Sequence, residues 1–105
     1  MAAAWYNLGV IRLELKELAP AAEAMEHAVQ LEAANPLAWY HLGRVREALG
    51  QVEPALAAYH KAVELDATLV DAWQNLSALL ENAGRHDEAE AAKQNAISAL
   101  HPQSA

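Results

Sequence analysis

The chain has 105 residues, which is room for one compact domain, and it contains no cysteine, so no disulfide bond can stabilise it. Its formal net charge is -7, with the acidic residues spread along the chain, and a polyanion such as DNA or RNA would therefore be repelled. Charges interrupt the apolar runs well before the roughly 18 residues that a membrane span needs. The N-terminus lacks the positive start and long apolar stretch of a secretory signal. This leaves the compartment open but favours the cytoplasm.

A period of 34 residues organises the sequence, because the three tryptophans, Trp5, Trp39 and Trp73, are spaced at this interval. The same interval aligns four further columns of apolar or small residues: Leu8, Leu42 and Leu76; Gly9, Gly43 and Ser77; Ala21, Ala55 and Ala89; Ala28, Ala62 and Ala96. The period divides the chain into repeats at residues 2–35, 36–69 and 70–103, with 104–105 as a tail. Since alanine dominates the hydrophobic residues, we expect each repeat to consist of two helices.

The aligned columns are expected to form the packed core. Their small residues let helix backbones approach closely, and larger side chains such as Met25, Val29 and Leu31 fill the remaining space. The tryptophans stand beside the packing leucines, and we expect them to belong to this core and not to a ligand site.

The first repeat begins inside a helix, and Pro20 marks its second helix. Lys16 occupies the position where the other two repeats have glycine, so we expect this turn to be the least regular of the three. The first helix and its turn carry apolar residues that no preceding repeat covers: Ile11, Leu13, Leu15 and Leu18. Two explanations are open, namely that the chain is the C-terminal part of a longer array or that this edge pairs with a second copy.

The second repeat carries the clearest helix boundaries. Asn35 is expected to cap a helix whose first residue is Pro36, and this helix should end near Gly50. Pro54 is expected to start the second helix, which should continue to about Asp66.

The third repeat follows the same scheme, with Gly84 ending its first helix and Asp87 and Glu90 forming a capping box for the next. It is also more polar than the others at positions that would meet a fourth repeat: His86, Glu90 and Lys93. This polarity is typical of a terminal repeat, so we expect the stack to end here, with residues 101–105 frayed.

The sequence shows no catalytic or metal-binding pattern. The five histidines are not spaced three or four residues apart, and no cysteine supports them: they are His27, His41, His60, His86 and His101. Phosphate loops, nucleophile elbows and zinc-protease signatures are also missing. We therefore expect neither enzymatic activity nor a cofactor or metal.

The chain resembles the tetratricopeptide repeat family over nearly its whole length. The resemblance rests on tryptophan, leucine and glycine at this spacing, two alanines seven residues apart, and the Ala-Val-Glu-Leu-Asp run ending at Asp66. The resemblance implies an all-α fold, a right-handed superhelical stack of six helices known as an α-solenoid. It also implies a non-catalytic protein-interaction module. Such a module binds a peptide or a helix of a partner protein on its concave face.

By this resemblance, the first helix of each repeat lines the concave groove. The expected groove residues are Tyr6, Asn7, Val10, Tyr40, His41, Arg44, Gln74, Asn75 and Ala78, with Leu13, Glu47, Ala48, Glu81 and Asn82 nearer the rim. Chaperone-binding members hold a carboxylate at positions that are Tyr6, Val10, His41, Asp71 and Asn75 here. Because no cation is among them, binding of the chaperone carboxylate-clamp type is not expected. Self-association and a role as regulatory arm of a larger protein stay open as alternatives.

Overall fold

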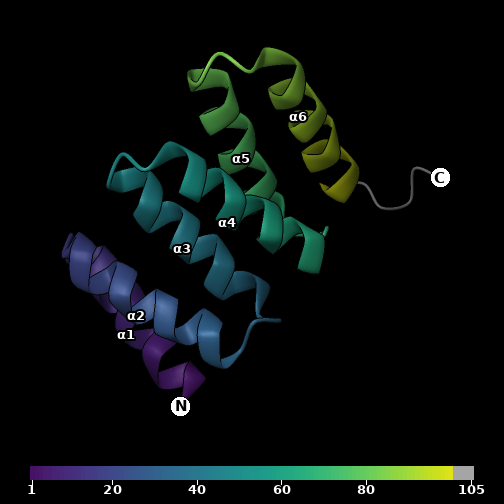
Figure 1. The fold of residues 1–105 in the computed structure, drawn as a ribbon. Helices are drawn as coiled ribbons and strands as arrows, with labels where there is room; N and C mark the ends of the chain where they lie inside the picture. The colour runs from purple at the N-terminus through teal and green to yellow at the C-terminus, as the bar shows by residue number, and fades with distance from the viewer. Residues whose placement is uncertain (101–105) are drawn as a thin grey trace.

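The computed structural model describes residues 1–100, and in this part of the chain it contains only helices (Figure 1). The elements in chain order are α1 (Ala2–Glu14), α2 (Leu18–Leu31), α3 (Pro36–Ala48), α4 (Val52–Leu65), α5 (Val70–Asn82) and α6 (His86–Leu100). The expectation of an all-α fold is therefore confirmed. The expectation for residues 101–105 lies outside the described residues.

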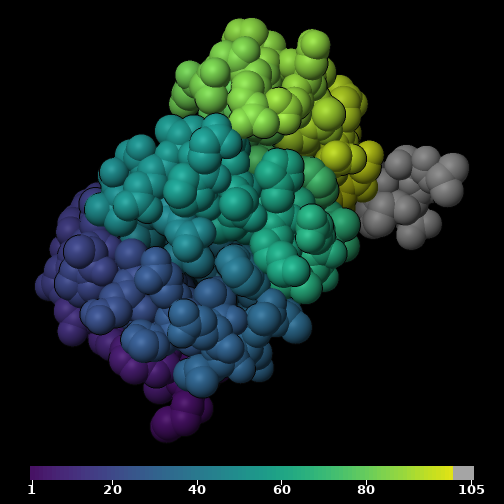
Figure 2. Space-filling model, viewed as in Figure 1, coloured from purple at the N-terminus to yellow at the C-terminus, as the bar shows by residue number. Residues whose placement is uncertain are grey.

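The helices are stacked as three successive pairs. Each of α1 with α2, α3 with α4 and α5 with α6 forms a closely packed pair, and smaller contacts of α2 with α3 and of α4 with α5 join the pairs. Figure 2 shows them as consecutive bands on the surface, from the N-terminal to the C-terminal pair. The molecule is elongated along the stack, with extents of 39 × 29 × 20 Å.

The turns inside the three pairs follow one backbone path. Gly50 and Gly84 take the left-handed conformation, with φ of 80° and 79°, and Lys16 takes it as well, with φ of 64°. In each turn the following amide N–H donates to a carbonyl five residues earlier, for example from Glu17 to Arg12 at 2.8 Å. The expectation of an irregular turn at Lys16 is therefore wrong. The fold imposes the left-handed conformation on Lys16 as well. A glycine at this position would adopt it without strain, whereas the lysine side chain makes it unfavourable.

The first helices start at the repeat boundaries, at Ala2, Pro36 and Val70, whereas the starts of the second helices differ from the sequence prediction. The side chain of Asn35 accepts from the backbone N–H of Leu37 at 3.0 Å, which confirms the cap. The second helices begin two residues before the prolines, at Leu18 and Val52. Proline is tolerated in the first turn because its missing N–H would have no partner inside the helix.

The capping box expected at Asp87 is wrong. The last helix starts at His86, so Asp87 is inside its first turn and not at the cap position. Glu90 instead contacts Lys93 and Gln94 along the same helix. An acidic residue in the first turn is still favourable because it faces the positive end of the helix dipole.

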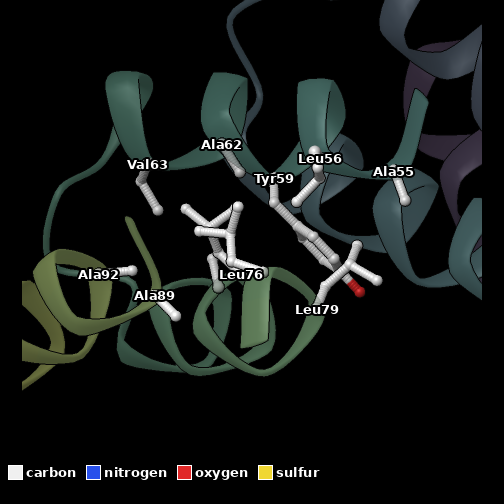
Figure 3. Close-up of a cluster of buried hydrophobic side chains, with 11 residues drawn as sticks. Ala55, Leu56, Tyr59, Ala62, Val63, Leu76, Leu79, Ala89 and Ala92 are labelled. Atoms are coloured by element: carbon white, nitrogen blue, oxygen red, sulfur yellow. The ribbon is translucent and has the colours of Figure 1, made fainter. Parts of the chain in front are cut away.

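The small-residue columns lie in the core. Figure 3 shows side chains of α4, α5 and α6 meeting in one cluster, with Tyr59 and Leu76 near its centre. The alanine columns are at most 5 % exposed: Ala21, Ala28, Ala55, Ala62, Ala89 and Ala96. A Cβ atom added to Gly43 would lie 2.7 Å from the ring of Tyr59, so glycine is needed for this close approach.

The three tryptophans pack against the buried clusters, as expected of core residues, but they are half-buried at the edge of the core. The indole N–H groups of Trp39 and Trp73 each donate a hydrogen bond of 2.8 Å to a backbone carbonyl in the turn that precedes their helix. Trp5 instead stacks on His27, with ring centroids 4.3 Å apart. A tryptophan that joins a helix to a turn must keep its polar edge near the surface. Leu31, also expected in the core, is 57 % exposed.

Candidate functional site

The first helices of the three pairs each present a face that is turned away from their buried leucines, although Tyr6, Val10 and Tyr40 on it also pack against the edge of the core. Three residues on each helix lie on it, at relative positions that share a face of an α-helix. They are Tyr6, Asn7 and Val10 on α1, Tyr40, His41 and Arg44 on α3, and Gln74, Asn75 and Ala78 on α5. All nine are exposed or half-buried, whereas Leu42 and Leu76 on the opposite faces are buried. We call these nine residues the concave set.

Tyr6 of α1 meets His41 of α3. The hydroxyl lies 3.4 Å from Nδ1 of His41, and the two rings are arranged edge to face with centroids 5.4 Å apart. Nδ1 also lies 2.9 Å from the carbonyl oxygen of Leu37, which can only accept, so this nitrogen carries a proton. Burial lowers the pKa of His41 from its ordinary value, and the neutral ring therefore leaves Nε2 as an acceptor.

Tyr40 repeats this contact one helix pair later. The side-chain amide of Asn75 on α5 donates to the Tyr40 hydroxyl at 3.4 Å. The guanidinium carbon of Arg44 lies 5.9 Å from the centre of the Tyr40 ring, in the range of a cation–π contact. These contacts hold neighbouring first helices together. In residues 1–100, the side chains of Asn7 and Gln74 form no hydrogen bond with another part of the chain and are free for a ligand.

Two hollows lie side by side along the first helices and share Arg44 and Ala48. One measures about 400 Å³ and is completed by Leu13, Glu14, Lys16 and Leu18. The other measures about 360 Å³ and is completed by Glu47, Tyr59, Asn75 and Ala78. Together they span the distance from α1 to α5.

The charged side chains of the second hollow differ in their partners. Arg44 forms no ion pair within residues 1–100. Glu47 accepts a hydrogen bond of 2.8 Å from the hydroxyl of Tyr59. Burial, and next the bond to Glu47, raise the pKa of Tyr59, so the hydroxyl keeps its proton and continues to donate. The second hollow thus offers a guanidinium without an ion-pair partner and a carboxylate that is held by Tyr59.

Sequence reasoning missed four lining residues of these hollows, Glu14, Lys16, Leu18 and Tyr59. Tyr59 lies on α4, outside the first helices on which the groove was expected, and its buried hydroxyl finds its hydrogen-bond partner in Glu47. Glu14 ends α1, Lys16 lies in the turn after it, and Leu18 is the first residue of α2, so their positions depend on the stacking of the pairs and not on local sequence.

A third hollow lies between α5 and α6, at the end of the stack. It measures about 670 Å³ and is lined by residues of both helices, among them the polar residues His86, Glu90 and Lys93 that the sequence places at an outer surface. In residues 1–100 no three of His, Cys, Asp and Glu gather in a way that could hold a metal ion. No helix in the same range is long and apolar enough to cross a bilayer.

Profiles of the tetratricopeptide repeat match residues 2–35, 36–69 and 58–91. The chain belongs to the tetratricopeptide repeat family. No curated protein matches it in sequence. The paired helices and the close approach at Gly43 are thus features of a tetratricopeptide solenoid, and the concave set lies on the first helices of its repeats.

Solved tetratricopeptide structures share this arrangement. The MamA chain in one crystal structure is 27 % identical to this chain in sequence, with a TM-score of 0.93. The match covers 98 % of this chain and 60 % of the MamA chain. MamA from Desulfovibrio magneticus RS-1 is 25 % identical, with a TM-score of 0.90 over 98 % and 58 % of the two chains. The Yersinia enterocolitica type III secretion chaperone SycD, in complex with a peptide of the translocator YopD, is 19 % identical, with a TM-score of 0.90 over 97 % and 78 %. The chain thus spans about three fifths of the length of the MamA chains.

Proposed function

We propose that this tetratricopeptide domain is a non-catalytic protein-interaction module that holds a peptide or helix of a partner protein against the concave set. The observation that carries the proposal is the pair of hollows that share Arg44 and run from α1 to α5. Asn7 and Gln74 are suited to the backbone of an extended or helical peptide. The SycD structure, which contains a translocator peptide, shows that this fold is compatible with such a ligand.

The charge of the chain favours an apolar or weakly basic partner segment. The formal net charge is -7, and a field of this sign attracts positive groups and repels acidic ones. The positions that hold a carboxylate in chaperone-binding relatives include Asp71, an acidic residue on the first turn of α5. This composition supports our view that the ligand is not an acidic C-terminal tail.

Substitutions at Tyr40 and Arg44 test the proposal. A phage-displayed library of random short peptides is selected on the immobilised chain, and the enriched peptides are titrated into wild type, Tyr40→Ala and Arg44→Ala by fluorescence anisotropy. Both variants should lose binding by about fivefold or more, since groove contacts of this kind contribute roughly 1 kcal/mol or more. Lys61→Ala on α4 is the matched control, and circular dichroism checks the fold of every variant. Selected peptides that bind both groove variants as tightly as wild type would contradict the proposal.

Self-association through α1 is the second candidate. Ile11 is 55 % exposed, whereas the residues in the same column of the next two repeats, Val45 and Leu79, are at most 5 % exposed because a preceding helix pair covers them. Exposed apolar surface of this kind favours pairing with another chain. Light scattering over a range of concentrations tests the idea. A monomer at all concentrations, for wild type and Ile11→Glu alike, would exclude it.

A further inference from the structure

In the first two repeats, a large side chain of the second helix lies against a glycine of the first helix. A Cβ atom added to Gly9 would lie 2.8 Å from the side chain of Met25, and one added to Gly43 would lie 2.7 Å from the ring of Tyr59. Met25 and Tyr59 are both fully buried. In these repeats the chain itself therefore fills the space between the paired helices.

The third repeat lacks this large side chain. The 34-residue period places Lys93 at the position of Tyr59, and Ser77 at the position of Gly43. Lys93 is exposed, and its ammonium nitrogen lies 3.9 Å from a carboxylate oxygen of Glu90 on the same helix. The hollow of about 670 Å³ between α5 and α6 lies at this place, and both Ser77 and Lys93 line it.

The carboxylate that binds the tyrosine of the second repeat is retained in the third. Glu47 accepts a hydrogen bond of 2.8 Å from the hydroxyl of Tyr59, and the equivalent residue one period later is Glu81, which lines the hollow. Oε2 of Glu81 lies 2.6 Å from Nδ1 of His86, whereas Oε1 has no partner within residues 1–100. The third repeat thus keeps the acceptor but not the aromatic ring that would donate to it.

The walls of this hollow are partly apolar and partly polar. Ile97 and Leu100, which are 47 % and 57 % exposed, form its apolar end. The other end, where α5 passes into α6, contains Glu81 and its histidine partner, and the exposed pair of Glu90 and Lys93 lies between the two ends. A phenol suits such a mixed wall, because the ring covers apolar surface while its hydroxyl donates to an acceptor.

From these observations we infer that the hollow between α5 and α6 binds a tyrosine side chain of a partner protein, with the ring over Ser77 and the hydroxyl donating to Glu81. The contact repeats the one that Tyr59 makes with Glu47 inside the second repeat. This inference goes beyond the proposed function, since most of the lining residues lie outside the concave set and no peptide needs to bind along the groove.

The size of the hollow points to a segment of a protein and not to a free amino acid. Its volume of about 670 Å³ is several times that of one aromatic ring, so residues next to the tyrosine can lie against Ile97 and Leu100. The Cβ atom of Ser77 fills part of the depth that glycine leaves open at Gly43. A ring that is not attached to α6 can lie further out and still reach Glu81.

Two blocked amino acids provide the first test. N-acetyl-tyrosinamide and N-acetyl-phenylalaninamide are titrated into the isotopically labelled chain, and the backbone amide shifts are followed by NMR. The shifts should cluster at Ser77, Glu81 and Lys93. The tyrosine amide should bind about fivefold more tightly, because a hydrogen bond to a charged acceptor is stronger than one between neutral groups. Equal affinities for the two amides, or shifts that cluster outside this hollow, would overturn the inference.

Variants of the protein test the two parts of the site. Glu81→Leu removes the acceptor, so the affinity for the tyrosine amide should fall to that for the phenylalanine amide. Glu64→Leu makes the same change at an exposed position of α4 and should have no effect. Lys93→Tyr combined with Ser77→Gly copies the second repeat, so the ring of the chain itself should fill the hollow and both amides should lose binding.

The fold of each variant is checked by circular dichroism. If Glu81→Leu and Glu64→Leu had the same effect, or if the filled variant bound like wild type, the site would be wrong. Glu81 is exposed, so Glu81→Leu decides the question even if the double variant does not fold.

Longer and shorter probes identify the source of the tyrosine. An acetylated peptide amide of one tyrosine and two leucines should bind about tenfold more tightly than the tyrosine amide, because the leucines add buried apolar surface. Free tyrosine should bind no more tightly than its blocked amide, and tighter binding would assign the hollow to an amino acid and overturn the partner segment. Tyr40→Ala and Arg44→Ala, which test the groove, should leave these affinities unchanged, so the two proposals fail separately.

Discussion

Replacing Lys16 by glycine should increase the free energy of unfolding, because Lys16 has φ of 64° in a turn where the other two repeats have glycine. A left-handed conformation costs an ordinary residue roughly 1–2 kcal/mol. The greater freedom of glycine in the unfolded chain offsets about 0.4–1 kcal/mol of this gain. The net effect is about 0.5–1 kcal/mol, which corresponds to a rise in melting temperature of roughly 3–6 °C for a domain of this size.

Gly50→Ala is the mirror experiment. A Cβ atom at Gly50 would meet no other atom within 4 Å, so the substitution changes the backbone energy without a steric clash. It should lower the free energy of unfolding by about 0.5–1 kcal/mol for the same reasons. Both variants are measured by urea and thermal denaturation followed by circular dichroism. If Lys16→Gly were neutral or destabilising while Gly50→Ala destabilised, the argument that Lys16 is strained would be refuted.

The core and the groove give further predictions. Gly43→Val should lower the free energy of unfolding by about 1–3 kcal/mol, since its Cβ would lie 2.7 Å from the Tyr59 ring, and an unchanged urea midpoint would contradict the packing. Tyr59→Phe should cost about 1 kcal/mol by removing the bond to Glu47, and a double-mutant cycle with Glu47→Ala isolates this bond, so purely additive losses would contradict it. Burial lowers the pKa of His41 below its ordinary value of 6.5, so its neutral form contributes stability that is fully present above about pH 6.5 and is lost as the pH falls below that value. His41→Gln should therefore lose less stability than wild type between pH 7 and about pH 5, and equal losses would show that His41 does not titrate with unfolding.

The sequence predicted the helix pairs because their boundaries depend on local chemistry. Asn35 caps α3 through its own side chain, and Gly50 and Gly84 end helices through their own backbone freedom. Lys16 shows where this reasoning stops. Its residue type disfavours the left-handed turn, but the packing of α1 against α2 requires it, and tertiary contacts outweigh a local preference of this size.

The groove could be predicted only as a set of residues. The 34-residue period placed Tyr6, His41, Tyr40 and Asn75 on first helices, but it could not show that a tyrosine of one repeat meets a residue 35 positions later. These contacts follow from the rotation between successive repeats, which depends on the volumes of side chains such as Tyr59 and Met25. The hydrogen bonds of Trp39 and Trp73 were not predicted for a related reason, because their indole N–H groups bond to turn carbonyls whose positions only the fold determines.

The same tyrosines that line the groove also join its helices, and this links the shape of the site to the stacking of the repeats. The hydroxyls of Tyr6 and Tyr40 each contact the first helix of the following repeat, and the Tyr40 ring lies beneath Arg44. A change in the rotation between repeats would therefore also move Arg44, the cation that both hollows share. Each of these hydrogen bonds is 3.4 Å long and individually weak. The geometry of the groove is therefore determined mainly by the buried alanine and glycine columns, and the hydroxyls adjust the site that those columns have already formed.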